Sequence, residues 1–447
     1  MPIHMPSDTR AVLGEKGEKC ESRSLFMDRF AQPAAKEAER DQWFKTLIRP
    51  QPGVTHRKEL PLAAGAVTLY AQLQSRLMVN MAGGVMENAG LCLDRFGLPY
   101  IPGSAVKGCA RRMAIQQLLD TREPDAKAEL LGKIALVFGW GETEWSNGKQ
   151  GGSFLSDFAY AVGDGLWDEV SSSARRQLPD VNHFGGLVGF LPSWPVDASG
   201  ANLPLPVPAL GQLEMDIVTC HHKDYYGRKE KNGALVMPVA LDSEEPNPVK
   251  FPAVAAGHVF AFVLAPLRAC SQALLSAAES WLKEGLSLFG LGAKTAAGYG
   301  WFDCSPDLQN KVEEALTKRE KVEAEKRKQA AEEAAAKAKA AAEEKKKAEM
   351  KAALKDLSPE QQQDYKVSQM TDDQFRSAMD DFLNRAPEQQ KAIMHALRLE
   401  PGRPSSRREF WNTLKIKEAK GGKPARIANA IRQLSNQMFP GKEGKMP

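Results

Sequence analysis

Two segments of this sequence hold residue types that can bind an anion. The first spans residues 100–108 and reads Tyr-Ile-Pro-Gly-Ser-Ala-Val-Lys-Gly. Pro102 disfavours helix before it, so we expect a helix to begin near Gly103 with Ser104 as its N-cap. Unpaired N–H groups at a helix start attract anions, and Lys107 adds a positive charge one turn later. Such a corner can hold an RNA phosphate, although an ordinary strand-to-helix turn has the same composition.

The second segment is a glycine-rich loop over residues 290–300, which carries Lys294 and Thr295. Backbone N–H groups in such a loop can cradle a phosphate. In a Walker A motif the lysine directly follows a glycine, whereas here three residues separate Gly290 from Lys294. The dinucleotide fingerprint fails too, because Thr295 stands at the position of its third glycine. An ATPase or a dehydrogenase is therefore disfavoured.

Histidine, tyrosine and aspartate side chains offer other chemistry. Adjacent His221 and His222 point to opposite faces of a strand, and no second Cys/His cluster lies nearby, so a zinc site is disfavoured. Tyr225 and Tyr226 are suited to stacking on unpaired bases, while a purely structural histidine pair stays open. Asp94 is either a ligand for metal-assisted RNA cleavage or a turn residue, and the turn is favoured.

Composition limits the class of protein. Hydrophobic residues make up 43% and charged residues 26% of the 447, so a large core is feasible and wholesale disorder is excluded. Six cysteines without a CxxC pair exclude a stapled secreted scaffold and a standard zinc ribbon. The N-terminus lacks an apolar signal region, and the longest apolar stretch, 251–267, is too broken to span a bilayer. We expect a cytoplasmic protein with no membrane partner and no cofactor.

The pattern of apolar residues predicts an α+β body over 61–306, after a polar N-terminal segment at 1–60. Alternation from Val67, with Gln72 among the polar positions, predicts a strand with one buried face. Apolar residues at helical spacing predict a helix over 271–289 that ends at a glycine.

The last third of the chain differs in composition. Residues 311–354 are rich in Ala, Glu and Lys, and their i,i+4 charge pairs favour a solvated helix of about 65 Å, with a disordered linker as the alternative. Capping boxes that start at Ser358, Thr371 and Ser406 predict a small all-α module over 357–440. The net charge is +4, but residues 401–447 alone carry eleven Lys/Arg against three Asp/Glu. The basic patch of this module consists of Lys415, Lys417, Lys420, Lys423, Arg426 and Arg432.

Five segments in a fixed order carry a family resemblance. They are SRLMVNMAGGVMENAGLCLDRFGLPYIPGSAVKGCAR, VFGWGETEWSNGKQGGSFLSDF, MDIVTCHHKDYYG, EPNPVKFPAVAAGHVFAFVL and GLGAKTAAGYGWF. The sequence resembles the RAMP superfamily of CRISPR systems and, within it, the sixth-subunit family of the Cmr, or type III-B, effector complexes. The likeness to the superfamily depends on the Pro-Gly-Ser corner and the final glycine-rich loop. The likeness to the sixth-subunit family within it depends on the His-His-Lys-Asp-Tyr-Tyr and Pro-Asn-Pro-Val segments. The likeness covers about residues 20–305.

The resemblance implies a ferredoxin-like (RRM-like) core with insertions, followed here by the long charged helix and the small all-α module. It implies a non-catalytic subunit that binds CRISPR RNA near its 3′ end and caps the backbone filament, in antiviral defence against foreign RNA and DNA. Its partners would be CRISPR RNA, target RNA and the fourth-type, first-type and small fifth-type Cmr subunits. The residues implied to contact RNA are Gly103, Ser104, Lys107, Arg111, Arg112, Gly292, Lys294 and Thr295.

The sequence departs from the family in two ways. Position 105 is Ala where a second serine is common, and residues 311–447 have no usual counterpart. The extension either binds RNA or a neighbouring subunit through its basic module, or only aids solubility or assembly. Two other functions stay open: a stand-alone RAMP-like endoribonuclease that processes CRISPR repeat RNA with His221 or His222, and a type III-A-like backbone or end subunit.

Overall fold

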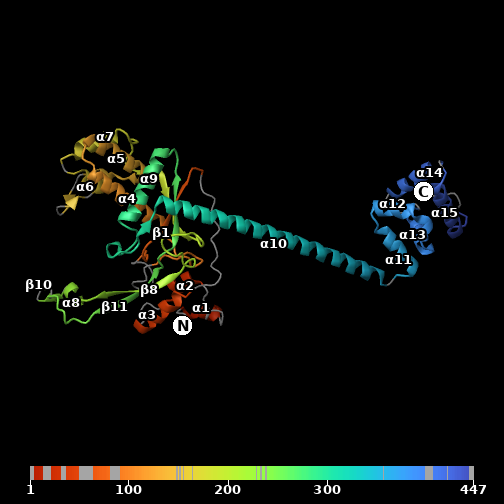
Figure 1. Cartoon of the computed structure of the whole chain (residues 1–447), viewed down its shortest axis with the longest axis horizontal. Coiled ribbons are helices and arrows are strands. Elements are labelled where there is room, and N and C mark those ends of the chain that lie inside the picture. Colours follow the sequence, from red (N-terminus) through yellow and green to blue (C-terminus); the bar gives the residue numbers. More distant parts are fainter. Residues whose placement is uncertain are drawn as a thin grey trace. The chain divides into compact units, whose positions relative to one another are not determined.

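The chain forms two compact units, Met1–Glu323 and Ala324–Pro447, which are described separately. Helices and antiparallel sheets together confirm the predicted α+β class (Figure 1). None of the described helices is long and apolar enough to cross a membrane. The computed structural model describes residues 5–13, 22–31, 37–49, 64–80, 91–146, 149–150, 153–154, 156–163, 165–227, 229–231, 234–236, 239–355, 357–397, 406–419 and 421–441.

Helices and strands occur throughout the described residues. The α-helices are α1 (Ser7–Leu13), α2 (Arg23–Asp28), α3 (Glu37–Leu47), α4 (Gly103–Asp120), α5 (Pro124–Phe138), α6 (Asp157–Val162), α7 (Trp167–Arg175), α8 (Lys223–Tyr226), α9 (Gln272–Leu288), α10 (Pro306–Leu354), α11 (Pro359–Ser368), α12 (Asp372–Asp380), α13 (Pro387–Leu397), α14 (Ser406–Glu418) and α15 (Lys423–Met438). Short 3-10 helices are η2 (Glu142–Trp145), η3 (Thr295–Ala297) and η4 (Phe382–Asn384). The strands are β1 (Val67–Leu73), β2 (Gly139–Trp140), β3 (Lys149–Gln150), β4 (Ser153–Phe154), β5 (Phe184–Gly185), β6 (Val188–Phe190), β7 (Trp194–Val196), β8 (Leu213–Cys220), β9 (Lys229–Lys231), β10 (Ala234–Val236), β11 (Asn247–Val254), β12 (Val259–Pro266) and β13 (Phe302–Asp303).

The Met1–Glu323 unit is built on an antiparallel sheet in the order β13–β1–β12–β6, in which β7 also pairs with β12. In the register of the two central strands, Val67 lies opposite Leu264 and Gln72 lies opposite Val259. The strand expected from Val67 onward is thereby confirmed.

Helices α4 and α9 cover one face of this sheet and run antiparallel to each other. Gly285 of α9 lies so close to Cys109 of α4 that an added Cβ would meet the Cys109 carbonyl oxygen at 2.9 Å. Farther along, Trp281 Nε1 donates to Gln117 Oε1 at 2.5 Å. The predicted helix over 271–289 is confirmed as α9, with Ser271 as its N-cap.

The start of α10 covers the opposite face of the sheet. Leu308 and Val312 are buried and pack in one cluster with residues of β7 and β12. The side-chain amide of Gln309 bonds to both backbone groups of Tyr70 in β1: it accepts from the Tyr70 N–H at 2.8 Å and donates to the Tyr70 carbonyl oxygen. The compact unit therefore extends to Glu323, whereas composition alone ends the body where this helix begins.

Gln72 departs from the expected alternation. The pattern places it on an exposed face of β1, but its side chain is fully buried. Its amide donates to the Leu205 carbonyl oxygen at 2.7 Å and to the Gly257 carbonyl oxygen at 3.2 Å. Both faces of the strand are covered, and the buried amide is tolerated because it has partners.

The N-terminal helices pack onto the body although their sequence shows little apolar periodicity. Phe26 of α2 and Trp43 of α3 stack with ring centroids 4.6 Å apart. The buried Arg23 donates to the Gly211 carbonyl oxygen at 2.8 Å and to the Arg49 carbonyl oxygen at 2.7 Å. These contacts hold the start of the chain against residues far away in sequence.

The Ala324–Pro447 unit contains the five helices α11 to α15 around a core of its own, in which Trp411, Phe375 and Phe382 are almost fully buried. Capping boxes at Ser358 and Thr371 are present as predicted, whereas α14 already includes Ser406, so Ser406 is not its N-cap and that prediction is wrong. Apolar side chains from every one of these helices line the core, so the module packs as a unit.

Candidate functional site

The glycine-rich loop is fixed to the chain that follows β1. The Ala293 N–H donates to the Met78 carbonyl oxygen at 2.8 Å, and the Gly300 N–H donates to the Arg76 carbonyl oxygen at 2.9 Å. Gly292 has φ +98°, and a Cβ there would lie 2.3 Å from the Met78 carbonyl oxygen. Gly292 is therefore required by the backbone and its packing. Seven of the eleven N–H groups in the loop donate to backbone carbonyl oxygens inside the protein, so most of them are not presented to a ligand.

Lys294 and Thr295 lie on the outer part of this loop, half-buried. Lys294 has φ +58°, a left-handed conformation that costs a non-glycine residue about 1 kcal/mol. Its ammonium lies 5.8 Å from the centroid of the Phe251 ring. The Thr295 carbonyl oxygen accepts from Trp301 Nε1 at 3.2 Å, which steadies the turn that presents both residues.

A charged network that the sequence did not predict connects Tyr299 of the loop with Arg76 and with two acidic residues of β8. Tyr299 Oη donates to Asp216 of β8 at 2.5 Å, and Arg76 reaches both Asp216, at 3.2 Å, and Glu214, at 2.8 Å. Burial alone raises the pKa of Asp216, but hydrogen bonds from Tyr299 and from the Ile217 N–H, followed by the charge of Arg76, outweigh it and hold that pKa below its ordinary value. Burial, and next the bond to Asp216, raise the pKa of Tyr299 to about 12. The network ties the loop to β8.

Tyr299→Phe should lower the free energy of unfolding of this unit by about 1–2 kcal/mol at pH 7, because it removes a charge-assisted hydrogen bond. The pKa of Asp216 is lowered in the folded state, so its stabilising contribution is present above the ordinary carboxyl pKa and is lost as pH falls through the lowered one. The difference between variant and parent should therefore shrink on acidification. Denaturant titrations from pH 7 to about pH 3 measure it; a difference independent of pH would show that Asp216 is not the partner that matters.

The start of α4 differs from the expected cap. The N-cap is Pro102, the helix begins at Gly103, and Ser104 is an exposed second helical residue whose side chain makes no capping bond. The N-cap assignment of Ser104 is therefore wrong, because Pro102 already has the extended backbone that a cap needs. Gly103 allows a close approach, and the approaching group is the protein's own Phe190 carbonyl oxygen, 2.3 Å from an added Cβ.

Lys107 and Arg111 are bound within the protein. Lys107 Nζ donates to the Phe138 carbonyl oxygen at the end of α5, at 2.7 Å, and its pKa is lowered, chiefly by burial and then by Arg111. Arg111 bridges Glu144, at 2.9 Å, and Asp157, at 2.5 Å. Both side chains position α5, η2 and α6 on α4, so the structure gives them partners other than RNA.

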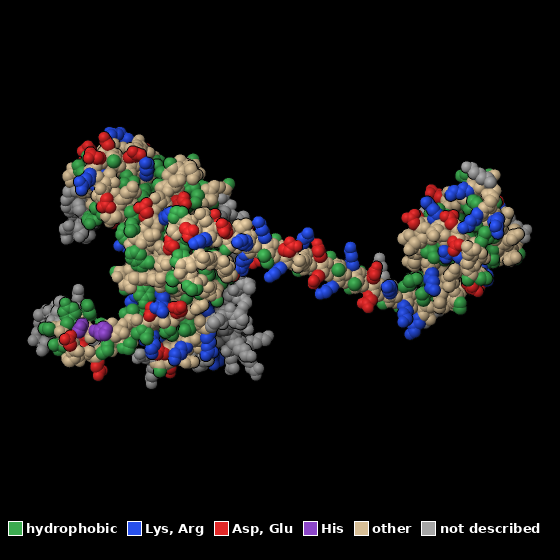
Figure 2. Space-filling model, in the orientation of Figure 1, with side chains coloured by type: hydrophobic (Ala, Val, Ile, Leu, Met, Phe, Trp, Pro, Cys, Tyr) green, Lys and Arg blue, Asp and Glu red, His purple; other side chains and the backbone are tan. Residues whose placement is uncertain are grey.

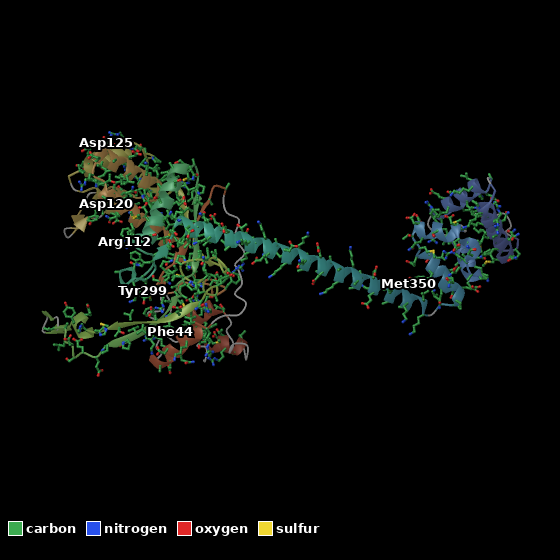
Figure 3. The ribbon with its side chains drawn as sticks, viewed as in Figure 1. Phe44, Arg112, Asp120, Asp125, Tyr299 and Met350 are labelled. Carbon is green, nitrogen blue, oxygen red and sulfur yellow. The ribbon has the colours of Figure 1, made fainter. Side chains whose placement is uncertain are left out.

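Arg112 is exposed, and its guanidinium lies 4.2 Å from the centroid of the Phe289 ring at the end of α9. Because α4 and α9 are antiparallel, the glycine-rich loop that follows α9 lies toward the N-terminal end of α4. Figure 3 accordingly shows Arg112 between Asp120 and Tyr299. The structure thus brings Arg112, the loop with Lys294 and the start of α4 to one side of the unit.

The aromatic candidates lie elsewhere, on an arm formed by β8 and β11 (Figure 1). Tyr225 and Tyr226 of α8 are exposed and pack edge to face, with ring centroids 5.2 Å apart. His221 follows the end of β8, about 16 Å along the extended strand from Asp216, where the arm meets the loop. Figure 2 shows histidine side chains toward the outer end of the arm, with the unit hollowed between this arm and the helices α5 to α7. The histidines and the glycine-rich loop are thus not brought together.

Asp94 is a turn residue. Its Oδ1 accepts from the N–H groups of Phe96, at 2.8 Å, and Leu98, at 3.0 Å, and its Oδ2 accepts from Trp194 Nε1 at 3.2 Å. Across the described ranges, no three His, Cys, Asp or Glu side chains cluster as metal ligands would.

The residues of the basic patch in the second unit differ in whether another side chain of the protein contacts them. Arg432 forms a two-pronged ion pair with Glu418, at 2.5 and 2.6 Å, and Lys415 lies 5.6 Å from the Trp411 ring centroid. Lys420 lies outside the described residues. Exposed charge is left on Lys417, Lys423 and Arg426.

Comparison with known proteins agrees with the pattern of segments in the sequence. Residues 61–303 match the family model of the RAMP superfamily. The CRISPR system Cmr subunit Cmr6 of Pyrococcus furiosus is 28% identical over 242 residues, which are 53% of this chain and 67% of the relative.

Two solved structures also overlap with the chain. The crystal structure of Cmr6 from Pyrococcus furiosus is 25% identical with a TM-score of 0.28, covering 54% of this chain and 97% of that one. A chain of a type IV-B CRISPR complex is 15% identical with a TM-score of 0.26, covering 54% of this chain and 90% of that one. At these TM-scores neither overlap establishes a shared fold, and the assignment depends on the sequence match over 61–303. The chain belongs to the RAMP superfamily.

Proposed function

We propose that this chain is a non-catalytic subunit of a type III CRISPR effector complex of the Cmr kind, and that it binds CRISPR RNA. The observation that carries the proposal is the family match over residues 61–303, which includes both predicted anion-binding segments. The Cmr6 relative supports the Cmr kind. Placement near the 3′ end of the RNA, capping of the filament, contact with fourth-, first- and fifth-type subunits and a cytoplasmic location complete the proposal.

The sheet supports a ferredoxin-like core. Its elements follow the chain order β1, α4, β6 with β7, β12, α9 and β13, which is a strand–helix–strand–strand–helix–strand sequence. In space the strands lie in the order β13, β1, β12 and β6, so that the first and third are central. This arrangement sets the glycine-rich loop beside the chain leaving β1.

RNA contact is proposed for Lys294, Thr295, Arg112 and Ser104, which lie toward one side of the unit and have exposed or half-buried side chains. The strained conformation of Lys294 supports a functional role, since a glycine would adopt it without cost. Contacts of this kind hold phosphates and fix register without reading bases. Tyr225 and Tyr226 offer a separate stacking surface on the arm. Lys107 and Arg111 would act indirectly, by positioning α5, η2 and α6.

Purification of tagged full-length protein from its host tests the proposal, with the co-purified proteins and RNA both identified. Cmr-type subunits and trimmed CRISPR RNA are expected. The Lys294→Ala variant should recover less RNA, whatever the spacer sequence, and the salt dependence of its binding should fall by up to about one unit of slope. A changed base preference with an unaltered slope would contradict phosphate binding at Lys294.

The stand-alone endoribonuclease is the second candidate. It needs a histidine beside bound RNA, and its only support is that His221 and His222 lie next to the stacking pair Tyr225 and Tyr226 in sequence. Recovery of the chain alone with cleaved repeat RNA, and loss of cleavage in His221→Ala or His222→Ala, would favour it over the proposal.

A further inference from the structure

The second unit contains a cavity of about 520 Å³ between α12, α14 and α15. Its walls are apolar at the base, where Met379, Leu414 and Ile427 line it, and aromatic on one side, where Phe410 lies. This volume is within the range of sites that enclose small organic groups. The cavity lies outside the residues matched by the RAMP model, so nothing in that match assigns it a ligand.

Charged groups line the rest of the cavity, and positive charge prevails. Arg376, Lys417 and Lys423 contribute cations, against the single carboxylate of Asp380. Among the residues that the structure describes, neither Lys417 nor Lys423 forms an ion pair, whereas nearby Arg432 is matched by Glu418. The two lysines are therefore available to an anionic ligand.

Phe410, the aromatic side of the cavity, is in contact with the cation Arg376. The Arg376 guanidinium lies 5.1 Å from the centroid of the Phe410 ring. Phe410 in turn packs at 5.9 Å against Phe375, which is fully buried in the core. A guanidinium held over a ring that is anchored in this way presents a flat cationic group to the cavity, and unpaired bases stack on guanidinium planes as well as on aromatic rings.

We propose that this cavity binds an unpaired nucleotide of single-stranded RNA. The base enters against the Arg376–Phe410 pair and the apolar floor, while Lys417 and Lys423 hold the flanking phosphates. Asp380 accepts a hydrogen bond from an N–H group of the base. An acidic peptide fits less well, because Asp380 repels a second carboxylate and the apolar floor needs a ring to fill it.

The proposal is independent of the function assigned to the RAMP body, and its test separates the two. Full-length protein is titrated with a short single-stranded oligoribonucleotide that carries thiouridine, irradiated, and digested so that cross-linked peptides are mapped by mass spectrometry. Cross-links are expected on the peptide that contains Phe410. Cross-links to peptides of the Met1–Glu323 unit report RNA binding by the RAMP body separately. The result can therefore contradict one proposal without contradicting the other.

The double variant Lys417→Gln/Lys423→Gln should weaken binding at the Phe410 peptide. Each phosphate contact to single-stranded RNA contributes a salt slope of about 0.7, or roughly fivefold in affinity at about 0.1 M salt. We therefore expect a loss of about 25-fold at this peptide and a slope lower by about 1.4, with cross-links to the body unchanged.

The matched control is Lys415→Gln/Arg426→Gln, which removes the same charge from the same two helices but does not line the cavity. It should retain most of the binding at Phe410. Equal losses in both double variants would show diffuse attraction and overturn the proposal, as would absence of cross-links at Phe410 in folded parent protein. Cross-linking of a co-purified protein partner to α14 in place of RNA would identify a protein-docking site and overturn it as well. Circular dichroism confirms folding of each variant.

Discussion

Gly300→Ala should lower the free energy of unfolding of the Met1–Glu323 unit by about 3 kcal/mol or more, the largest effect expected of any substitution in the glycine-rich loop. Gly300 has φ +69°, and an added Cβ would lie 1.9 Å from the Leu291 carbonyl oxygen. The alanine therefore incurs both the cost of a left-handed backbone and a collision with backbone that cannot rotate away. Denaturant titration followed by tryptophan fluorescence measures the loss.

Gly298→Ala is the control for this prediction. Gly298 also has a positive φ, +91°, but a Cβ there would meet nothing within 4 Å. Only the conformational cost remains, so we expect a loss of about 1–2 kcal/mol. Comparable losses in the two variants would mean that the close approach to Leu291 does not form in solution.

Arg407→Met should lower the stability of the second unit by about 3 kcal/mol. Arg407 is 4% exposed, and its guanidinium donates to the carbonyl oxygens of Val367, at 2.8 Å, and Ser368, at 3.1 Å, where α11 ends. It also lies 4.6 Å from the centroid of the Phe375 ring. Methionine preserves much of the packing but removes the guanidinium donor, and the Val367 carbonyl oxygen keeps only local bonds such as that from the Met370 N–H, at 3.3 Å, so the attachment of α14 to α11 weakens.

Hydrogen exchange measures this effect where it should occur. Faster exchange is expected throughout α11 to α15, because these helices share one core, while the Met1–Glu323 unit exchanges as before. Arg426→Met removes an equal charge from the exposed surface of α15 and should change exchange little. A variant of Arg407 that keeps parental exchange rates would show that its buried hydrogen bonds do not hold the module together.

Local features were readable from the sequence because they depend on neighbours along the chain. The alternation from Val67 predicted β1, the helical spacing over 271–289 predicted α9, and the spacing of Ser358 and Thr371 from their glutamines predicted two capping boxes. The order of the five segments that resemble the family was enough to indicate the RAMP superfamily, which the family match confirms.

The partners of the candidate site residues were not readable, because they come from distant parts of the chain. Lys107 and Arg111 have the composition of an anion site, yet their partners lie 31 to 46 positions away, in α5, η2 and α6. Asp216 and Tyr299, which secure the glycine-rich loop, are 83 positions apart. Gly103 lies against the backbone of β6, which is 87 positions away and which only the fold brings to the start of α4.

The amide of Gln309 does for β1 what a neighbouring strand would do. The short strand β13 pairs with β1 at Gln72 and Leu73, and just before that pairing Gln309 bonds to both backbone groups of Tyr70. A chain shortened to Pro306 would uncover those groups and the apolar residues beneath Leu308 and Val312. Because an open, unprotected edge is a template for pairing with another molecule, such a chain is expected to self-associate, whereas one shortened after Glu323 keeps its edge closed. The first turns of α10, up to Glu323, therefore belong to the body, and the extension proper begins after them.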